Sequence, residues 1–401
     1  MTEKHKEQAL LEEFRQVTPV FSELFVFKFL RDKDILSSRT LSNIKKLVTE
    51  QALYEGYDTN TNLINTYKGV FNIATRKVEP RNNRLFDRIL PHYDPIADAP
   101  AFTQLLDNYN TPDYPDLSED LLNLFAYQLF GNNKLKTFFI AWGDGNNAKS
   151  TLWQLVENAL GSSDKGGYAN KVSSETFIAD GKSFNVGLTE INNSRFLFAD
   201  EIKQGVELDG NLIKQAVAGE GSTIKFNEKG NKHQVTANVL TPVTLLLNEV
   251  PNFKSADQAT INRLAVIEFT KQFMPGDKEA EALIEQAKQE QAGIFNLIES
   301  HYNPDWVIPK RWRLSALTIV DEQKFDDDIL YKLQTVLAPL IHKTGDAADK
   351  VKRSELHAEL DKRYKAEYGE ARPSTRELIR LMPRLNIGLS GNYYTKILLD
   401  K

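Results

Sequence analysis

Residues 137–160 place the strongest constraint on the fold of this chain. The apolar run 137–142 is followed by a Gly- and Asn-rich turn and then by a helical stretch that opens at Lys149 and stops before Gly161. This pattern predicts a buried strand, a tight loop and a helix. Strand–loop–helix units of this kind belong to α/β folds, in which helices cover a parallel sheet.

The turn in this unit has the composition of a phosphate-binding loop. Backbone N–H groups at the start of a helix converge on an anion at the positive end of the helix dipole. Lys149 would reach the β- and γ-phosphates of a nucleotide, and the Ser150 hydroxyl would ligate Mg²⁺. We therefore expect a site for ATP and Mg²⁺ formed by Gly143, Asp144, Gly145, Asn146, Asn147, Ala148, Lys149, Ser150 and Thr151.

Ala148 departs from the phosphate-loop pattern, which asks for glycine immediately before the lysine. We interpret the glycine preference as a need for the backbone to approach the phosphates closely, so that alanine adds one methyl group. Gly143 and Gly145 would allow the tight path of the loop. The other interpretation is that a small-residue turn precedes a helix by chance.

Three later apolar runs, 195–200, 241–248 and 263–269, are short, rich in β-branched or aromatic residues and bounded by polar ones. Runs of this kind are typical of central strands in a covered sheet. Alternation of such strands with helical stretches predicts an α/β sandwich.

Polar residues at the ends of these runs are of the types that ATP hydrolysis needs. Asp200 would hold the metal through water, and Glu201 would polarise the attacking water. Asn248 would position that water beside the γ-phosphate, and Arg263 would act on charge across a subunit boundary. Taken singly, each fits a polar turn or a solvated strand edge equally well. Their order along the chain favours catalysis.

A hairpin with strands at 222–226 and 233–237 is expected between Asp200 and Asn248. Its basic residues are Lys225, Lys229, Lys232 and His233. Lysines hold nucleic-acid phosphates without reading sequence, so the hairpin is a candidate DNA contact. The alternative is an exposed turn with ordinary surface lysines.

The composition of the chain limits which classes of function and partner are possible. The 50 basic and 55 acidic residues give a net charge of −5, so any nucleic-acid contact must be local. The chain has no cysteine, which excludes disulfides, zinc–thiolate sites and thiol nucleophiles. Its start is polar, and no apolar run approaches the ~20 residues of a membrane span. We expect no membrane partner and a cytoplasmic location, in the host cytoplasm if the protein is phage-encoded.

Changes in residue pattern along the chain predict three structural regions. Residues 1–115 form a mixed α+β region that serves as a collar or partner-binding part, 116–305 the ATPase core, and 306–401 a C-terminal module. The core would open with a helix capped by Ser118 and ended by Gly131. In the module, Ser374 and Glu377 have capping-box spacing, and two helices followed by a hairpin predict a small winged-helix fold.

As a set, these motifs resemble the superfamily 3 helicases, in particular the poxvirus-type and phage/plasmid primase-associated branch. The family loop GxGxNGKST is matched by GDGNNAKST except at Ala148, and RFLFADE, the hairpin region, TPVTLLLNEVPN and INRLAVIEF follow in the family order. The similarity covers roughly residues 65–300, and the C-terminal module is also typical of the family.

The resemblance implies an AAA+-like core that assembles into a ring, usually a hexamer, with ATP between neighbours and hairpins around single-stranded DNA. It assigns Lys149 and Ser150 to nucleotide and Mg²⁺, Asp200 and Glu201 to metal and water, and Asn248 to sensing. Arg263 would act on the neighbour's ATP, and Lys229, Lys232 and, less firmly, His233 would contact DNA.

The function that we expect is an ATP-dependent replicative helicase of a phage, plasmid or other mobile element, acting on single-stranded and forked DNA. Residues 1–115 show no acidic metal-binding pattern, so a separate primase or replication initiator is the expected partner. The alternative is a P-loop ATPase that melts an origin or loads other proteins without processive unwinding. A small-molecule kinase is disfavoured by the paired acids, the hairpin and the arginine before a strand.

Overall fold

The computed structural model describes residues 60–81, 86–177, 194–200, 207–227, 234–249, 251–254, 257–274 and 276–399, together with Asn43 and Ile191. Contacts divide the chain into two compact units, with the boundary between Ala316 and Leu317. Each unit is described by itself below.

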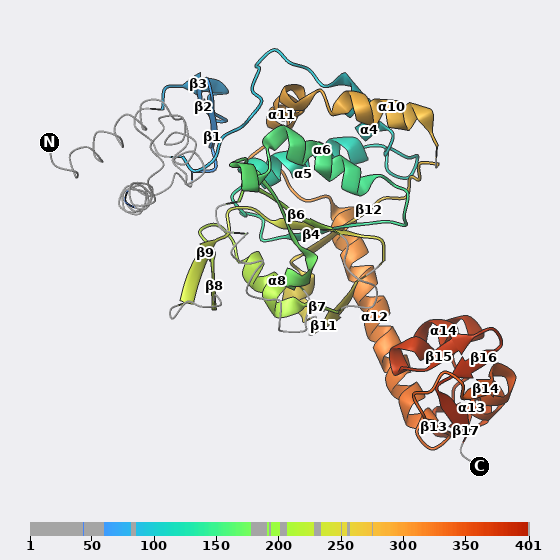
Figure 1. The fold of residues 1–401 in the computed structure, drawn as a ribbon. Helices are drawn as coiled ribbons and strands as arrows, with labels where there is room; N and C mark the ends of the chain where they lie inside the picture. Colours follow the sequence, from blue (N-terminus) through green and yellow to red (C-terminus); the bar gives the residue numbers. More distant parts are fainter. Residues whose placement is uncertain are drawn as a thin grey trace. The chain divides into compact units, whose positions relative to one another are not determined.

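A five-stranded sheet forms the centre of the first unit (Figure 1). All pairs are parallel, in the order β12-β4-β10-β6-β5. The apolar runs predict four of these strands to within two residues, and the near-complete burial of those four explains why they lack polar alternation. The edge strand over 169–173 has a mixed polar pattern and matches none of the predicted runs. The strands are β4 (Phe138–Trp142), β5 (Ala169–Ser173), β6 (Phe196–Asp200), β10 (Val243–Leu247) and β12 (Leu264–Glu268). The predicted α/β class is confirmed, and the sheet is compatible with a P-loop-like core.

Helices cover one face of this sheet (Figure 1). Phe139 and Ala141 of β4 pack on them in one large hydrophobic core, while Phe138 and Ile140 alternate to the other face. The helices next to the sheet are α5 (Leu117–Phe130) and α6 (Lys149–Leu160). Beyond them lie α4 (Pro100–Asp107), α10 (Lys278–Ala287) and α11 (Gln291–Ser300). The predicted bounds of α6 and the stop at Gly161 are confirmed.

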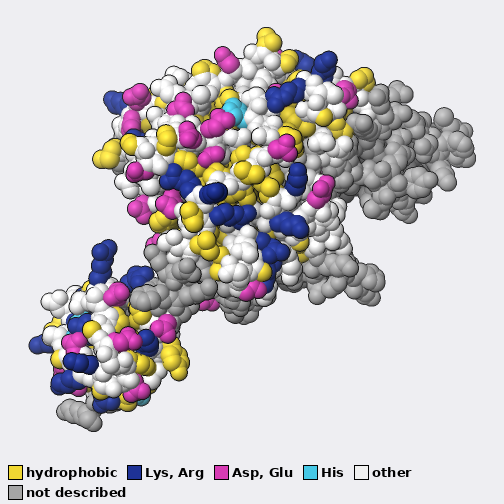
Figure 2. Space-filling model, turned by 180° about the vertical axis from the view of Figure 1, so that it is seen from behind, with side chains coloured by type: hydrophobic (Ala, Val, Ile, Leu, Met, Phe, Trp, Pro, Cys, Tyr) yellow, Lys and Arg dark blue, Asp and Glu magenta, His cyan; other side chains and the backbone are white. Residues whose placement is uncertain are grey.

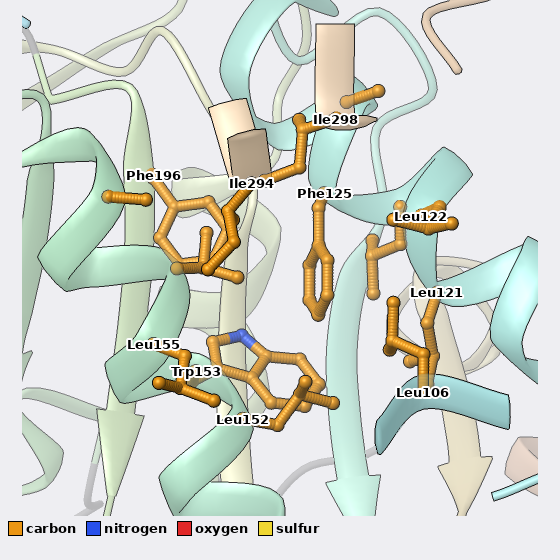
Figure 3. Packing of buried hydrophobic residues seen from close by; sticks show 14 of the residues in the cluster. Leu106, Leu121, Leu122, Phe125, Leu152, Trp153, Leu155, Phe196, Ile294 and Ile298 are labelled. Carbon is orange, nitrogen blue, oxygen red and sulfur yellow. The ribbon is translucent and has the colours of Figure 1, made fainter. Parts of the chain in front are cut away.

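Trp153 anchors α6 in this core. Its indole is fully buried and meets the ring of Phe125 from α5 edge-on, at 5.2 Å between centroids. Figure 3 shows the two rings among Leu106, Leu152 and Leu155, with Phe196 and Ile294 nearby. Burying an aromatic side chain of this size strongly stabilises the packing of α6 against α5.

The cap predicted for α5 is wrong. The N-cap residue is Asp116, and the helix starts at Leu117. The Ser118 side chain instead accepts a hydrogen bond from Asn110 Nδ2 at 2.8 Å. A tertiary contact therefore competes with the local capping geometry. The predicted end at Gly131 is confirmed.

A small antiparallel sheet precedes the core, formed by β1 (Leu63–Thr66), β2 (Gly69–Asn72) and β3 (Lys77–Glu79). Arg195, which is buried just before β6, donates hydrogen bonds to the carbonyls of Asn60, Thr61 and Leu63 and so ties this sheet to the core.

The other elements of the first unit lie between β6 and β12 in sequence. The hairpin strands begin one residue later than predicted. The elements are β7 (Glu207–Asp209), α8 (Gly210–Ala216), β8 (Thr223–Asn227), β9 (Gln234–Asn238), β11 (Asn252–Lys254) and α9 (Gln258–Ile261). Two 3₁₀ turns, η1 (Ser163–Lys165) and η2 (Ser174–Phe177), flank β5.

The second unit has its own core and begins inside α12 (Lys310–Leu337). The capping box of Ser374 and Glu377 is confirmed. Gly391 has φ +55°, a left-handed conformation that glycine adopts readily. The two helices and the hairpin occur as predicted; the winged-helix assignment stays a prediction. The elements are β13 (Ile341–Lys343), β14 (Lys350–Lys352), α13 (Arg353–Tyr368), α14 (Thr375–Leu381), η3 (Met382–Leu385), β15 (Gly388–Ser390), β16 (Tyr393–Thr395) and β17 (Ile397–Leu399).

None of the helices in the described part of the chain is both long and apolar enough to cross a membrane.

Candidate nucleotide-binding site

The carboxyl edge of the parallel sheet brings the sequence motifs together. In the register of the sheet, Leu247 of β10 lies opposite Trp142, and Leu246 lies opposite Asp200 at the end of β6. The loop after β4, Asp200 and Asn248 after β10 therefore leave the sheet side by side. Edges of this kind are where open α/β sheets bind ligands.

The backbone of the loop takes a left-handed turn immediately before α6. Ala148 is the N-cap residue and has φ +52° and ψ +18°, and Asn146 has φ +62°. The left-handed region costs an alanine roughly 1–2 kcal/mol, which glycine does not pay. The predicted reason for glycine at position 148 therefore needs correction: the conformation of the backbone, more than the added methyl group, makes Ala148 unfavourable.

The two glycines of the loop differ in whether a side chain would fit in their place. A Cβ on Gly143 would lie 2.4 Å from the Phe269 carbonyl oxygen and 2.6 Å from Asn147 Nδ2, so no side chain fits there. A Cβ on Gly145 would meet nothing within 4 Å, and its φ is not positive. Packing of the chain explains Gly143, whereas Gly145 is exposed at the open side of the loop.

Buried contacts hold the loop from beneath. Tyr109 donates its hydroxyl to the Asn147 carbonyl at 2.9 Å, and Phe273 donates its N–H to the Asn146 carbonyl at 2.7 Å. The Asn147 amide closes the loop on the Asp144 carbonyl at 2.6 Å. Tyr109 and Phe273 are remote from the loop in sequence and neither lies in a motif, so their contacts with the loop are not predictable from local patterns.

Lys149 is the most strongly held side chain of the site. It is 3% exposed, and its Nζ donates to the Gly143 carbonyl at 3.0 Å, to Asn147 Oδ1 at 3.2 Å and to Asn248 Oδ1 at 2.5 Å. Burial lowers the pKa of this ammonium, and the carboxylates of Asp200 and Asp144 oppose that shift. The site thus holds a partly desolvated cation at the start of a helix.

Ser150 and Asp200 form the second half of the site. The Ser150 hydroxyl donates to Asp200 Oδ1 at 3.1 Å, and a cavity of about 250 Å³ borders both residues. Mg²⁺ prefers oxygen ligands and keeps several waters, each of which takes up about 30 Å³. A hydroxyl and a carboxylate beside such a space fit a hydrated Mg²⁺. Lys171 on β5, which sequence analysis missed, lies 3.6 Å from Asp200 Oδ2.

Arg263 lies at the opposite, amino edge of the sheet. Its carbonyl accepts the N–H of Phe138 at the start of β4, and its Nη1 donates to the Ala259 carbonyl at 2.7 Å. The structure does not bring Arg263 together with Lys149 in one chain. Beside it, Arg313 of α12 donates to the carbonyls of Asn262 and Leu264 and to Thr137 Oγ1.

Thr151, the last residue of the predicted loop, lies in α6 and lines the same cavity as Ser150. The predicted residues outside the loop that remain are not placed by the structure. Glu201, Lys229, Lys232 and His233 lie outside the described residues, and so does the side chain of Lys225, whose backbone belongs to β8. On the described surface, Lys and Arg side chains gather in the middle of the first unit on the face seen in Figure 2.

Comparison with known proteins finds distant relatives among viral proteins that are named as helicases. "Putative helicase V13" of Sputnik virophage is 25% identical over 184 residues, "Putative helicase L207/L206" of Acanthamoeba polyphaga mimivirus is 26% identical over 194, and "Putative helicase 184R" of Invertebrate iridescent virus 6 is 23% identical over 244. The matches cover 44%, 48% and 57% of this chain.

The chain spans only 22%, 20% and 24% of the length of these three relatives. No protein-family model matches it. Among solved structures, the C-terminal region of NrS-1 aligns with a TM-score of 0.41 at 14% identity, over 79% of this chain and 80% of that chain.

Proposed function

We propose that this chain is the ATP-dependent motor of a superfamily 3 DNA helicase that acts in the replication of a phage, plasmid or other mobile element. In this proposal the motor moves along single-stranded DNA as a ring. The observation that carries the proposal is the meeting of Lys149, Ser150, Asp200 and Asn248 at one sheet edge. These residue types perform Mg·ATP hydrolysis in P-loop proteins. The names of the three viral relatives support the same class of function.

In this proposal, Lys149 exchanges its three oxygen acceptors for the β- and γ-phosphate oxygens, beside the backbone N–H groups at the start of α6. Ser150 and Asp200 hold Mg²⁺, which supplies charge neutralisation to the phosphates when bound. Asn248, released from Lys149, orients the attacking water, and Glu201 polarises it.

The proposed assembly is a ring, most simply a hexamer. Because Arg263 and Lys149 lie at opposite sheet edges, Arg263 would serve the nucleotide of a neighbouring copy. The β8–β9 hairpin, with Lys225, Lys229 and Lys232, would hold DNA phosphates. The basic area in Figure 2 supports a local contact with nucleic acid despite the acidic net charge. A separate primase or initiator would complete the replication machinery.

A strand-displacement assay on forked DNA tests this function. Lys149→Ala should weaken ATP binding by about 100-fold, because a charge-assisted contact to phosphate contributes up to about 3 kcal/mol, and unwinding should disappear. Lys278→Ala, which removes an exposed lysine of α10, is the matched control and should behave as the wild type. Unwinding that survives Lys149→Ala would refute the site. ATP-dependent assembly on DNA without strand separation would support the origin-melting or loading function instead.

A further inference from the structure

Asp200 is contacted from two sides by groups of its own chain. Oδ1 accepts the Ser150 hydroxyl at 3.1 Å, and Oδ2 lies 3.6 Å from Lys171 Nζ. The Asp200 side chain is 12% exposed, whereas that of Lys171 is 45% exposed. The Lys171 ammonium therefore already lies beside the Asp200 carboxylate. A divalent cation held by Ser150 and Asp200 would have to share that carboxylate with Lys171.

We infer that Lys171 is a positioning residue that competes with Mg²⁺ for Asp200 and so raises the metal concentration at which the site fills. The inference rests on the proposed nucleotide site. In the absence of metal, Lys171 neutralises the carboxylate at the end of β6. When the dication arrives, the two positive charges repel each other, and the half-exposed lysine is the one with solvent to move into.

The order of the strands in the sheet indicates that Lys171 lies too far from the phosphate loop to be a phosphate ligand. Lys171 belongs to β5, the edge strand next to β6, whereas the phosphate loop follows β4, with β10 between β4 and β6. Three strand spacings separate β5 from β4, about 14 Å across the sheet. Lys149 already supplies a cation on the loop side of Asp200. Lys171 thus reaches Asp200 from the side away from the loop.

The test measures metal binding directly on the full chain, with Mn²⁺ as the probe and its free fraction read by electron paramagnetic resonance. A non-hydrolysable ATP analogue is present throughout at a concentration below that of the chain, so that little of it is free to chelate Mn²⁺, and the same mixture without the chain gives the background. Lys171→Met should bind Mn²⁺ about two- to fivefold more tightly than the wild type, the size expected for loss of a half-exposed ion pair. Lys171→Arg keeps the charge and should match the wild type. Unchanged or weaker Mn²⁺ binding by Lys171→Met overturns the inference.

A double-mutant cycle locates the effect at Asp200. Asp200→Asn should weaken Mn²⁺ binding, and adding Lys171→Met to it should then change the metal affinity no further. If Lys171→Met still tightens Mn²⁺ binding in the Asp200→Asn background, the lysine acts elsewhere and the inference fails.

Nucleotide binding in EDTA, followed with a fluorescent ATP analogue, separates this inference from the proposed function. Lys171→Met and the wild type should bind the nucleotide equally. A loss in Lys171→Met would make the lysine a phosphate ligand and overturn the inference alone. Equal, negligible binding by the wild type and Lys149→Ala, with and without metal, would remove the nucleotide site and the inference with it.

Discussion

The two edges of the five-stranded sheet use their basic side chains differently. At the carboxyl edge, Lys149 is gathered with Asn248 and Asp200 around one loop, and Asp200 borders a cavity. At the amino edge, Arg263 and Arg313 donate mainly to backbone carbonyls that surround the strand starts. A five-residue strand spans about 16 Å. Lys149 and Arg263 of one chain therefore cannot contact the same phosphate group. If both residues act on one nucleotide, they must come from two copies of the chain.

The largest effect is expected for Arg263→Ala, which tests whether the amino edge has a chemical role. Loss of an arginine that stabilises the transferring phosphate lowers kcat by about 10³-fold or more, while ATP affinity should stay within about twofold. Steady-state ATPase assays and nucleotide titrations measure the two quantities. When mixed with the wild type, the variant should suppress activity more steeply than simple dilution does.

Arg313→Ala is the matched control at the same edge. Arg313 makes three hydrogen bonds to the chain itself, so its loss should lower the free energy of unfolding by about 2–3 kcal/mol. Chemical denaturation checks this. If Arg263→Ala destabilises the protein as much and leaves kcat unchanged, both arginines only brace the strands, and the contrast between the edges is lost.

A smaller effect at the carboxyl edge is expected for Ala148→Gly. Removing the Cβ relieves the left-handed backbone and should stabilise the protein by about 1 kcal/mol. ATP affinity should be kept or rise a few-fold, as measured by calorimetry. Ala148→Val, with a branched Cβ, should change both quantities in the opposite direction. Complete loss of ATP binding by Ala148→Gly would show that the loop conformation is wrong.

The smallest effect is expected for Tyr109→Phe, which removes one brace of the loop. Burial raises the pKa of the Tyr109 hydroxyl far above its ordinary value, so this group stays protonated and donates across the physiological pH range. Its loss should cost about 1 kcal/mol of stability and weaken ATP binding a few-fold. Tyr67→Phe, at an exposed tyrosine, is the control. Equal behaviour of the two variants would mean that the loop needs no support from Tyr109.

Local signals were sufficient for most elements near the site. The bounds of α6 follow from the Gly-rich turn before it and Gly161 after it, and the central strands follow from apolar runs because burial on both faces excludes polar residues. The capping box at Ser374 is equally local. Sequence order therefore predicts which residues leave the carboxyl edge together.

Other features depend on tertiary contacts that no local pattern contains. Lys171 lies on a short edge strand with a mixed polar pattern, and only the pairing of β5 with β6 brings it to Asp200. Tyr109 reaches the loop from a Pro- and Asp-rich connection. The left-handed φ of Ala148 cannot be deduced from an alanine, because alanine rarely adopts it.

The strand order of the sheet has a consequence for synthesis on the ribosome. Both neighbours of β4 come from much later in the chain, β10 starting at Val243 and β12 at Leu264. At 5–20 residues per second, the apolar segment FFIAW emerges roughly 5–20 s before its first partner strand exists. During that interval its backbone N–H and C=O groups lack their sheet partners. A chaperone that covers this segment should therefore raise the yield of folded protein.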